Sequence, residues 1–112
     1  MIEPDWSRGV YHLFVIRVQN REEVMKRLAE ENIGTGIHYP VPLHLQNAYV
    51  SLGYRRGDFP VSEAVAPEIV SLPMFPQLRK EQQERVVESL ARVVFGARVG
   101  PGLNAVSIAA GD

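Results

Sequence analysis

The chain of 112 residues contains no cysteine and only two lysines. Without cysteine there is no disulfide framework and no thiolate metal site, which is typical of proteins in a reducing compartment. The amino end lacks the basic, apolar and small-residue order of a signal peptide, and no apolar run approaches the ~20 residues that span a bilayer. We therefore expect a cytoplasmic protein without a membrane partner.

An excess of charge of either sign is also missing, because 12 basic and 13 acidic residues are interleaved along the chain. A protein that binds a phosphate backbone needs a basic patch, so nucleic acid is not an expected partner. The 46% hydrophobic and 22% charged content is ordinary for one globular domain. We expect a lead-in at 1–9, a domain at 10–96 and a mobile tail rich in Gly and Ala at 97–112.

Hydrophobic periodicity predicts a strand followed by a helix in the first third of the chain. Residues 10–18 are apolar on both alternating faces, which is typical of a central strand that is covered on both sides. A helix over 21–31 follows, and Asn20 and Glu23 have the spacing of a capping box. Asn32 can adopt left-handed angles cheaply, so the helix should end there.

The remaining elements are two further strands, two further helices and a loop. The prolines at 40 and 42 should end the second strand, and Pro67 should bend the middle helix, which Ser62 would cap. The predicted ranges are strands at 35–39 and 71–74, helices at 62–70 and 79–95, and a loop at 43–60 with one short helical turn near 46–52. The fold class is therefore α/β (α+β), with helices on a small, mainly antiparallel sheet of three to four strands.

Three segments carry a resemblance when they are taken in this order and spacing. They are GTGIHYPVPLHLQ at 34–46, LGYRRGDFPVSE at 52–63 and SLPMFPQL at 71–78. Together they resemble the carboxy-terminal part of the DegT/DnrJ/StrS family of sugar aminotransferases, over about 11–94. The resemblance implies the small carboxy-terminal domain of a fold type I aminotransferase. It also implies pyridoxal phosphate as the cofactor of the intact enzyme, a nucleotide-linked keto-sugar as its substrate, a large domain outside this chain, and a homodimer.

The same resemblance implies a substrate-binding role for His38 and Tyr39, whose imidazole and phenol would donate hydrogen bonds to sugar hydroxyls or phosphates. The two side chains should point to opposite faces of a strand, unless the backbone twists at Pro40. His44 and Gln46 extend the same loop and are further candidates for substrate contact. For His44 a metal site needs more ligands than the loop offers, and a structural histidine bonded to loop backbone is the alternative.

Catalysis by pyridoxal phosphate needs a lysine amine in a sheltered site. Lys26 lies among charged residues of a helix and Lys80 lies at a helix start, so both are expected to be solvated. We therefore predict no catalytic, cofactor-binding or metal-binding residue in this chain and no activity of the chain alone.

Several expectations concern other polar residues. His12 is expected in the core, Asp58 is expected to stabilise its own turn, and Arg55 and Arg56 form a solvated tip or else face a diphosphate. Two other functions stay open, namely a stand-alone module that binds a small polar ligand and an interaction domain that dimerises through apolar surface.

Overall fold

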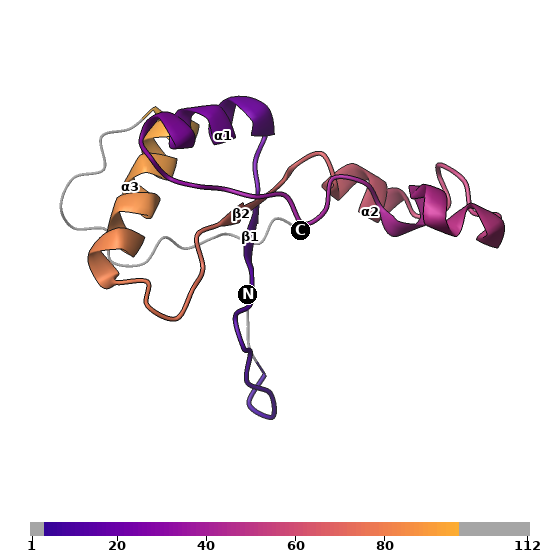
Figure 1. Ribbon diagram of the computed structural model, residues 1–112, viewed down its shortest axis with the longest axis horizontal. Coiled ribbons are helices and arrows are strands. Elements are labelled where there is room, and N and C mark those ends of the chain that lie inside the picture. The colour runs from indigo at the N-terminus through magenta and orange to yellow at the C-terminus, as the bar shows by residue number, and fades with distance from the viewer. Residues whose placement is uncertain (1–3, 97–112) are drawn as a thin grey trace.

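The computed structural model describes residues 4–96. The expected tail at 97–112 lies outside the described residues, as do the first three residues of the lead-in. Figure 1 shows a body, made of helices α1 and α3 beside strands β1 and β2, from which an arm projects to one side. We use "the arm" for residues 39–66, which contain the short helices η1, η2 and α2.

The sheet of the body is formed by β1 (Phe14–Arg17) and β2 (Ile69–Leu72), which pair antiparallel with Phe14 opposite Leu72. A third segment joins β2 through one antiparallel bridge between Gly36 and Ser71. The α+β class and the antiparallel pairing are confirmed, but the prediction of three to four strands is wrong within the described residues. The expected strand at 35–39 is reduced to this bridge, since Pro40 follows closely and lacks an amide donor.

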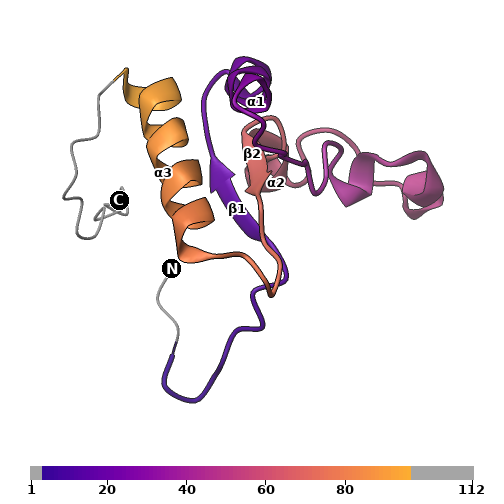
Figure 2. The ribbon, with the colours of Figure 1, turned by 60° about the vertical axis from the view of Figure 1, so that its left-hand side comes forward.

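Strand β1 is shorter and more exposed than the sequence predicted. It was expected to be a central strand covered on both sides, whereas within the described part of the chain it pairs with β2 alone. Helices α1 (Arg21–Glu30) and α3 (Lys80–Phe95) lie on one side of the sheet (Figure 2), so Val15 on the other face is exposed. His12, expected in the core, is exposed as well.

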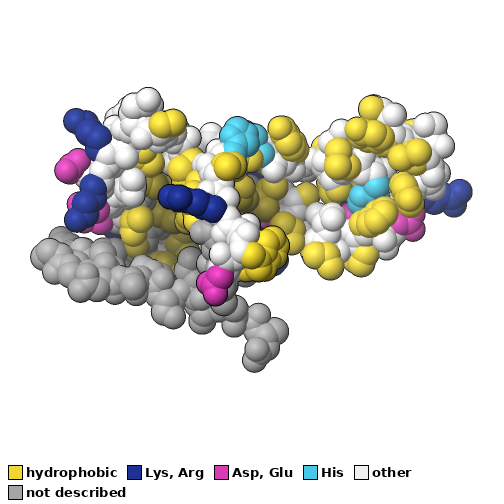
Figure 3. Space-filling model, turned by 90° about the horizontal axis from the view of Figure 1, so that it is seen from below, with side chains coloured by type: hydrophobic (Ala, Val, Ile, Leu, Met, Phe, Trp, Pro, Cys, Tyr) yellow, Lys and Arg dark blue, Asp and Glu magenta, His cyan; other side chains and the backbone are white. Residues whose placement is uncertain are grey.

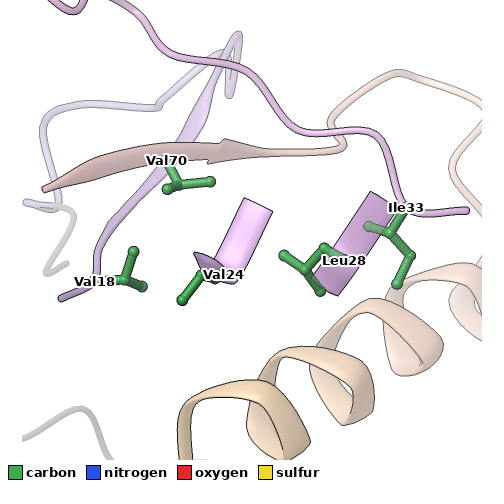
Figure 4. Close-up of a cluster of buried hydrophobic side chains, with 5 residues drawn as sticks. All are labelled: Val18, Val24, Leu28, Ile33 and Val70. Carbon is green, nitrogen blue, oxygen red and sulfur yellow. The ribbon is translucent and has the colours of Figure 1, made fainter. Parts of the chain in front are cut away.

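The core lies between the two helices and the sheet. Figure 4 shows its buried members, of which Leu28 is fully buried. They are Val18, Val24, Leu28, Ile33 and Val70. Half-buried side chains of α3 pack against this cluster at the helical spacing that the sequence indicated, namely Val86, Leu90 and Val93.

The helix ends differ in part from expectation. Helix α1 begins after Asn20, but Asn20 has a φ of 51° and its side chain makes no capping bond, so the expected capping box is wrong. Asn32 has a φ of 58°, which confirms the left-handed turn after the helix. Helix α2 (Pro60–Val65) starts with Pro60 at its first position and stops before Pro67, which cannot continue a helix. The expected bent helix over 62–70 is therefore shorter, and β2 starts at Ile69 rather than at Ser71.

The loop between Gly36 and α2 contains two 3-10 helices, η1 (Leu43–Leu45) and η2 (Asn47–Leu52). The second agrees with the short helical turn that was expected near 46–52. Arg21 ties this arm to the body, because its Nη1 donates a hydrogen bond of 2.8 Å to the carbonyl oxygen of Ala66. No helix in the described range 4–96 is long and apolar enough to cross a membrane.

Candidate functional site

Residues of the arm line most of an open cavity with a volume of about 650 Å³. This volume is in the range of small-molecule sites, ~300–1,000 Å³. Its wall is mostly apolar and aromatic, and Figure 3 shows hydrophobic side chains gathered over this part of the molecule. Apolar and aromatic walls with a few polar groups are typical of sites that bind small molecules, in which the polar groups fix the orientation of the ligand.

Three of the four predicted site residues line this cavity, namely Tyr39, His44 and Gln46. His38 does not line it. The rings of His38 and Tyr39 contact each other edge to face, with centroids 5.5 Å apart and planes at 72°. The two rings therefore do not point to opposite faces, which is the exception that was allowed for a backbone that twists near Pro40, and the pair forms one polar edge beside the cavity.

A contact with strand β2 holds the side chain of His38 in place. Its Nδ1 lies 2.8 Å from the Oγ of Ser71, and the same Ser71 exchanges two backbone hydrogen bonds with Gly36. The ring of His38 is thereby fixed against β2, while the residue stays exposed. The ring of Tyr39 contacts this anchored ring, and Tyr39 also lines the cavity.

His44 is a buried structural group of the arm. Its Nε2 lies 2.9 Å from Oε1 of Glu63, and the two side chains are only 7% and 11% exposed. The same carboxylate oxygen accepts a hydrogen bond of 2.7 Å from the amide of Gly57. The alternative to substrate contact that the sequence offered was a histidine bonded to loop backbone, and the observed partner is a carboxylate instead.

The Glu63 carboxylate connects three parts of the arm, since Gly57 precedes α2, Glu63 lies in α2 and His44 lies in η1. The amide of Gly57 and then the imidazole of His44 lower the pKa of Glu63 below its ordinary value. Phe59 packs on His44 with ring centroids 4.7 Å apart, and Tyr54 packs on Phe59 at 5.1 Å. Glu63 was not among the predicted site residues, although its segment was part of the resemblance.

Gln46 supports the same wall. Its Nε2 donates a hydrogen bond of 3.2 Å to the carbonyl oxygen of Val41, which closes the turn around η1. At the far end of the arm, Asp58 accepts a hydrogen bond of 2.8 Å from the amide of Arg55, which confirms the expected turn. Arg55 and Arg56 are exposed there, as expected of a solvated tip.

The lysines do not fit a covalent pyridoxal phosphate site. The side chain of Lys80 is 83% exposed, and its Nζ lies 3.6 Å from Glu84. Lys26 is exposed on α1. An amine must be sheltered to lose its proton and attack an aldehyde, and neither side chain has that surrounding. Within residues 4–96, no three His, Asp or Glu side chains are grouped as metal ligands would be.

Structures of known proteins show which class of protein has this fold. The fold matches that of DesV from S. venezuelae, a structure solved in complex with a ketimine intermediate, with a TM-score of 0.76 and 35% identity over 89% of this chain and 26% of that chain. A further match is an aminotransferase from Brucella abortus, with a TM-score of 0.74 and 32% identity over 83% of this chain and 25% of that one. The arrangement of helices, sheet and arm is therefore similar to that of part of these two proteins.

The chain belongs to the DegT/DnrJ/EryC1/StrS aminotransferase family, whose model matches residues 1–91. It is 49% identical over 79% of its length to the dTDP-3-amino-3,6-dideoxy-alpha-D-galactopyranose transaminase of Aneurinibacillus thermoaerophilus, of which it covers 24%. The chain spans about a quarter of the length of the curated relatives that it matches. The predicted family is confirmed, together with the interpretation of the chain as one part of such an enzyme.

Proposed function

We propose that this chain is the carboxy-terminal small domain, residues 10–96, of a nucleotide-sugar aminotransferase and that it supplies the sugar-facing rim of the active site. The observation that carries the proposal is the paired edge of His38 and Tyr39 beside an aromatic cavity. Family membership and the relatives' action on nucleotide-linked sugars support it.

The rim would bind and orient its ligand rather than perform chemistry on it. The phenol of Tyr39 and the imidazole of His38 can donate hydrogen bonds to sugar hydroxyl or phosphate oxygens. His44 and Gln46 would shape the cavity wall, because the Nε2 of each already has a protein partner. The amide of Gln46 also has a carbonyl oxygen that can accept a bond from a sugar hydroxyl.

The cofactor would be held by polypeptide outside this chain. Pyridoxal phosphate, when bound, supplies the electron sink that lets an amino group be transferred. Since neither Lys26 nor Lys80 is sheltered, we expect a large domain to contribute the lysine and the chain alone to be inactive. We further expect the intact enzyme to be a cytoplasmic homodimer.

A titration with a nucleotide sugar tests the rim. The purified chain, labelled with ¹⁵N, is titrated with a dTDP-linked sugar while backbone and imidazole signals are followed. We expect saturable shifts at His38, Tyr39 and Gln46, and weaker binding by Tyr39→Phe. His12→Ala is the control, because His12 is exposed and lies outside the cavity lining. Shifts confined to other residues, or no saturable shift, would overturn the proposal.

A second candidate function is an interaction module, and the apolar surface of the body favours it. Phe14 and Val15 of β1 are exposed large hydrophobic residues, as are Trp6 and Val10 in the segment that precedes the strand. Contiguous apolar surface is rare on monomers and marks contact sites. Sedimentation of the chain across a concentration series distinguishes this candidate. The interaction module is favoured if the chain forms a dimer that the Phe14→Glu change dissociates, and if no ligand shifts the signals of Tyr39.

A further inference from the structure

Ser71 occupies an unusual position for a hydroxyl group. It lies in the middle of β2, it is only 4% exposed, and its Oγ is 2.8 Å from the Nδ1 of His38. Two backbone hydrogen bonds with Gly36, of 3.0 and 2.8 Å, hold the serine opposite the segment that leads to His38. The backbone pairing of Gly36 with Ser71 thus places the hydroxyl of Ser71 next to the imidazole of His38.

The direction of this hydrogen bond follows from the surroundings of the hydroxyl. Within residues 4–96, Nδ1 of His38 is the one side-chain or backbone partner recorded for the Oγ of Ser71. A buried hydroxyl proton without an acceptor costs free energy, which favours donation from the Oγ of Ser71 to Nδ1. A neutral imidazole whose Nδ1 accepts a hydrogen bond carries its own proton on Nε2.

Gly36 lets the imidazole lie in this place. A Cβ atom at position 36 would come within 2.9 Å of Cε1 of His38, which is closer than two such carbon atoms tolerate. Any side chain at position 36 would therefore displace the ring from Ser71. Gly36, Ser71 and His38 therefore act together. The backbone bridge between Gly36 and Ser71 sets the distance between the hydroxyl of Ser71 and the ring of His38.

We propose that Ser71 is a positioning residue that holds His38 in its Nε2–H tautomer, so that this exposed residue offers a hydrogen-bond donor at Nε2. An Nε2–H group recognises an acceptor oxygen, which in a nucleotide sugar belongs either to the sugar or to the diphosphate. This use of the donor depends on the proposed function, whereas the tautomer itself does not.

The tautomer is measured on the full chain without ligand, from long-range ¹H–¹⁵N correlations of the imidazoles at a pH where they are neutral. We expect His38 to carry its proton on Nε2 throughout, while the exposed His12 reports the mixture of an unrestrained ring in the same spectrum. In Ser71→Ala the Nδ1–H form of His38 should rise to the fraction that His12 shows. Ser71→Thr, which keeps the hydroxyl, should restore the single tautomer.

Gly36→Ala gives a second variant that leaves the serine in place. It should release the tautomer in the same way, because the added Cβ displaces the ring. A mixed or Nδ1–H state of His38 in the unchanged chain would overturn the proposal, as would a Ser71→Ala spectrum with an unaltered His38.

Ligand titrations separate this proposal from the proposed function. If dTDP binds as tightly as the dTDP-linked sugar, the oxygen that accepts the bond from His38 belongs to the diphosphate. If only the dTDP-linked sugar binds, that oxygen belongs to the sugar. If His38 shows the single tautomer but neither ligand shifts its signals, the rim is overturned and the role of Ser71 stands. If ligand binds at His38 but Ser71→Ala leaves the tautomer unchanged, the role of Ser71 is overturned.

Discussion

The Nε2 of His44 lies 2.9 Å from Oε1 of Glu63, and this contact joins the first and last helices of the arm. Both side chains are almost fully covered, so the pair stabilises the walls of the cavity from within the protein. The wall of the cavity at His44 therefore depends on a contact between residues 19 positions apart in the sequence.

Replacement of Glu63 by Ala should loosen the arm while the body stays folded. The substitution removes the acceptor of both the Gly57 amide and the His44 imidazole. We expect hydrogen exchange of the Gly57 amide to become faster by an order of magnitude or more, with the amides of β2 unchanged. Glu88→Ala, at an exposed position of α3, is the matched control. Unchanged exchange at Gly57 would contradict the stabilising role of Glu63.

Acid should destabilise the body through Glu31, which follows α1. The Oε2 of Glu31 accepts bonds of 2.6 Å from both Ser89 and Arg92 on α3, and the hydroxyl of Ser89 and then Arg92 lower the pKa of Glu31. A carboxyl with a lowered folded pKa stabilises the protein above its ordinary pKa of 4.5 and loses this contribution as pH falls through the folded value.

The urea midpoint of the chain should accordingly fall as pH drops below about 4.5, the ordinary pKa of that carboxyl. Glu31→Gln should reduce this slope without abolishing it, because Glu63 and Glu22 also have lowered pKa values. Glu30→Gln, an exposed neighbour whose carboxylate makes no such contact with α3, should keep the slope of the unchanged chain. Equal slopes for all three proteins would exclude the Glu31 contact as a source of acid sensitivity.

Leu28 is the centre of the core and is fully buried. Leu28→Ala should lower the free energy of unfolding by ~2–5 kcal/mol, as deletion of buried methyl groups and the resulting cavity require. The matched change Leu43→Ala, at an exposed position of the arm, should stay within about 0.5 kcal/mol. Denaturant unfolding measures both, and a similar cost for the two leucines would contradict the described core.

Arg21 should contribute more to the stability of the protein than Arg27, the other arginine on α1, because Arg21 connects the arm to the body. The side chain of Arg21 is 11% exposed and donates to the carbonyl oxygen of Ala66, whereas Arg27 is 53% exposed and pairs with Glu23 on the same helix. We expect Arg21→Ala to cost ~1.5–3 kcal/mol, as for a charged group bonded to a carbonyl, and Arg27→Ala to cost under ~1 kcal/mol. The reverse order would rule out Arg21 as the link.

The sequence predicted the long helices well, because Val24 and Leu28 on α1 and Val86 and Leu90 on α3 repeat at helical spacing and are buried or half-buried as that spacing requires. It overestimated the sheet. Residues 35–39 have the composition of a strand, but only pairing in space decides a strand, and Gly36 alone makes that contact. For the same reason the apolar pattern at 10–18 could not indicate how many neighbours β1 has.

The sequence indicated candidate residues for the site, but it did not indicate their side-chain contacts. The resemblance identified His38 and Tyr39, and their loop added His44 and Gln46; three of these four residues line the cavity. The partners Ser71 and Glu63 are 33 and 19 residues away from the histidines that they contact. No local pattern indicates such pairs, since a serine in an apolar strand and a glutamate in a first helical turn each have ordinary local explanations.

The proposed function requires that neither lysine of this chain can hold the cofactor. Mass spectrometry of the purified chain after micromolar pyridoxal phosphate and borohydride reduction tests it most directly, with Lys26→Arg and Lys80→Arg variants as site controls. The account predicts no more than trace labelling, shared between the two exposed lysines. A stoichiometric adduct on Lys26 or Lys80, lost in the matching variant, would contradict it.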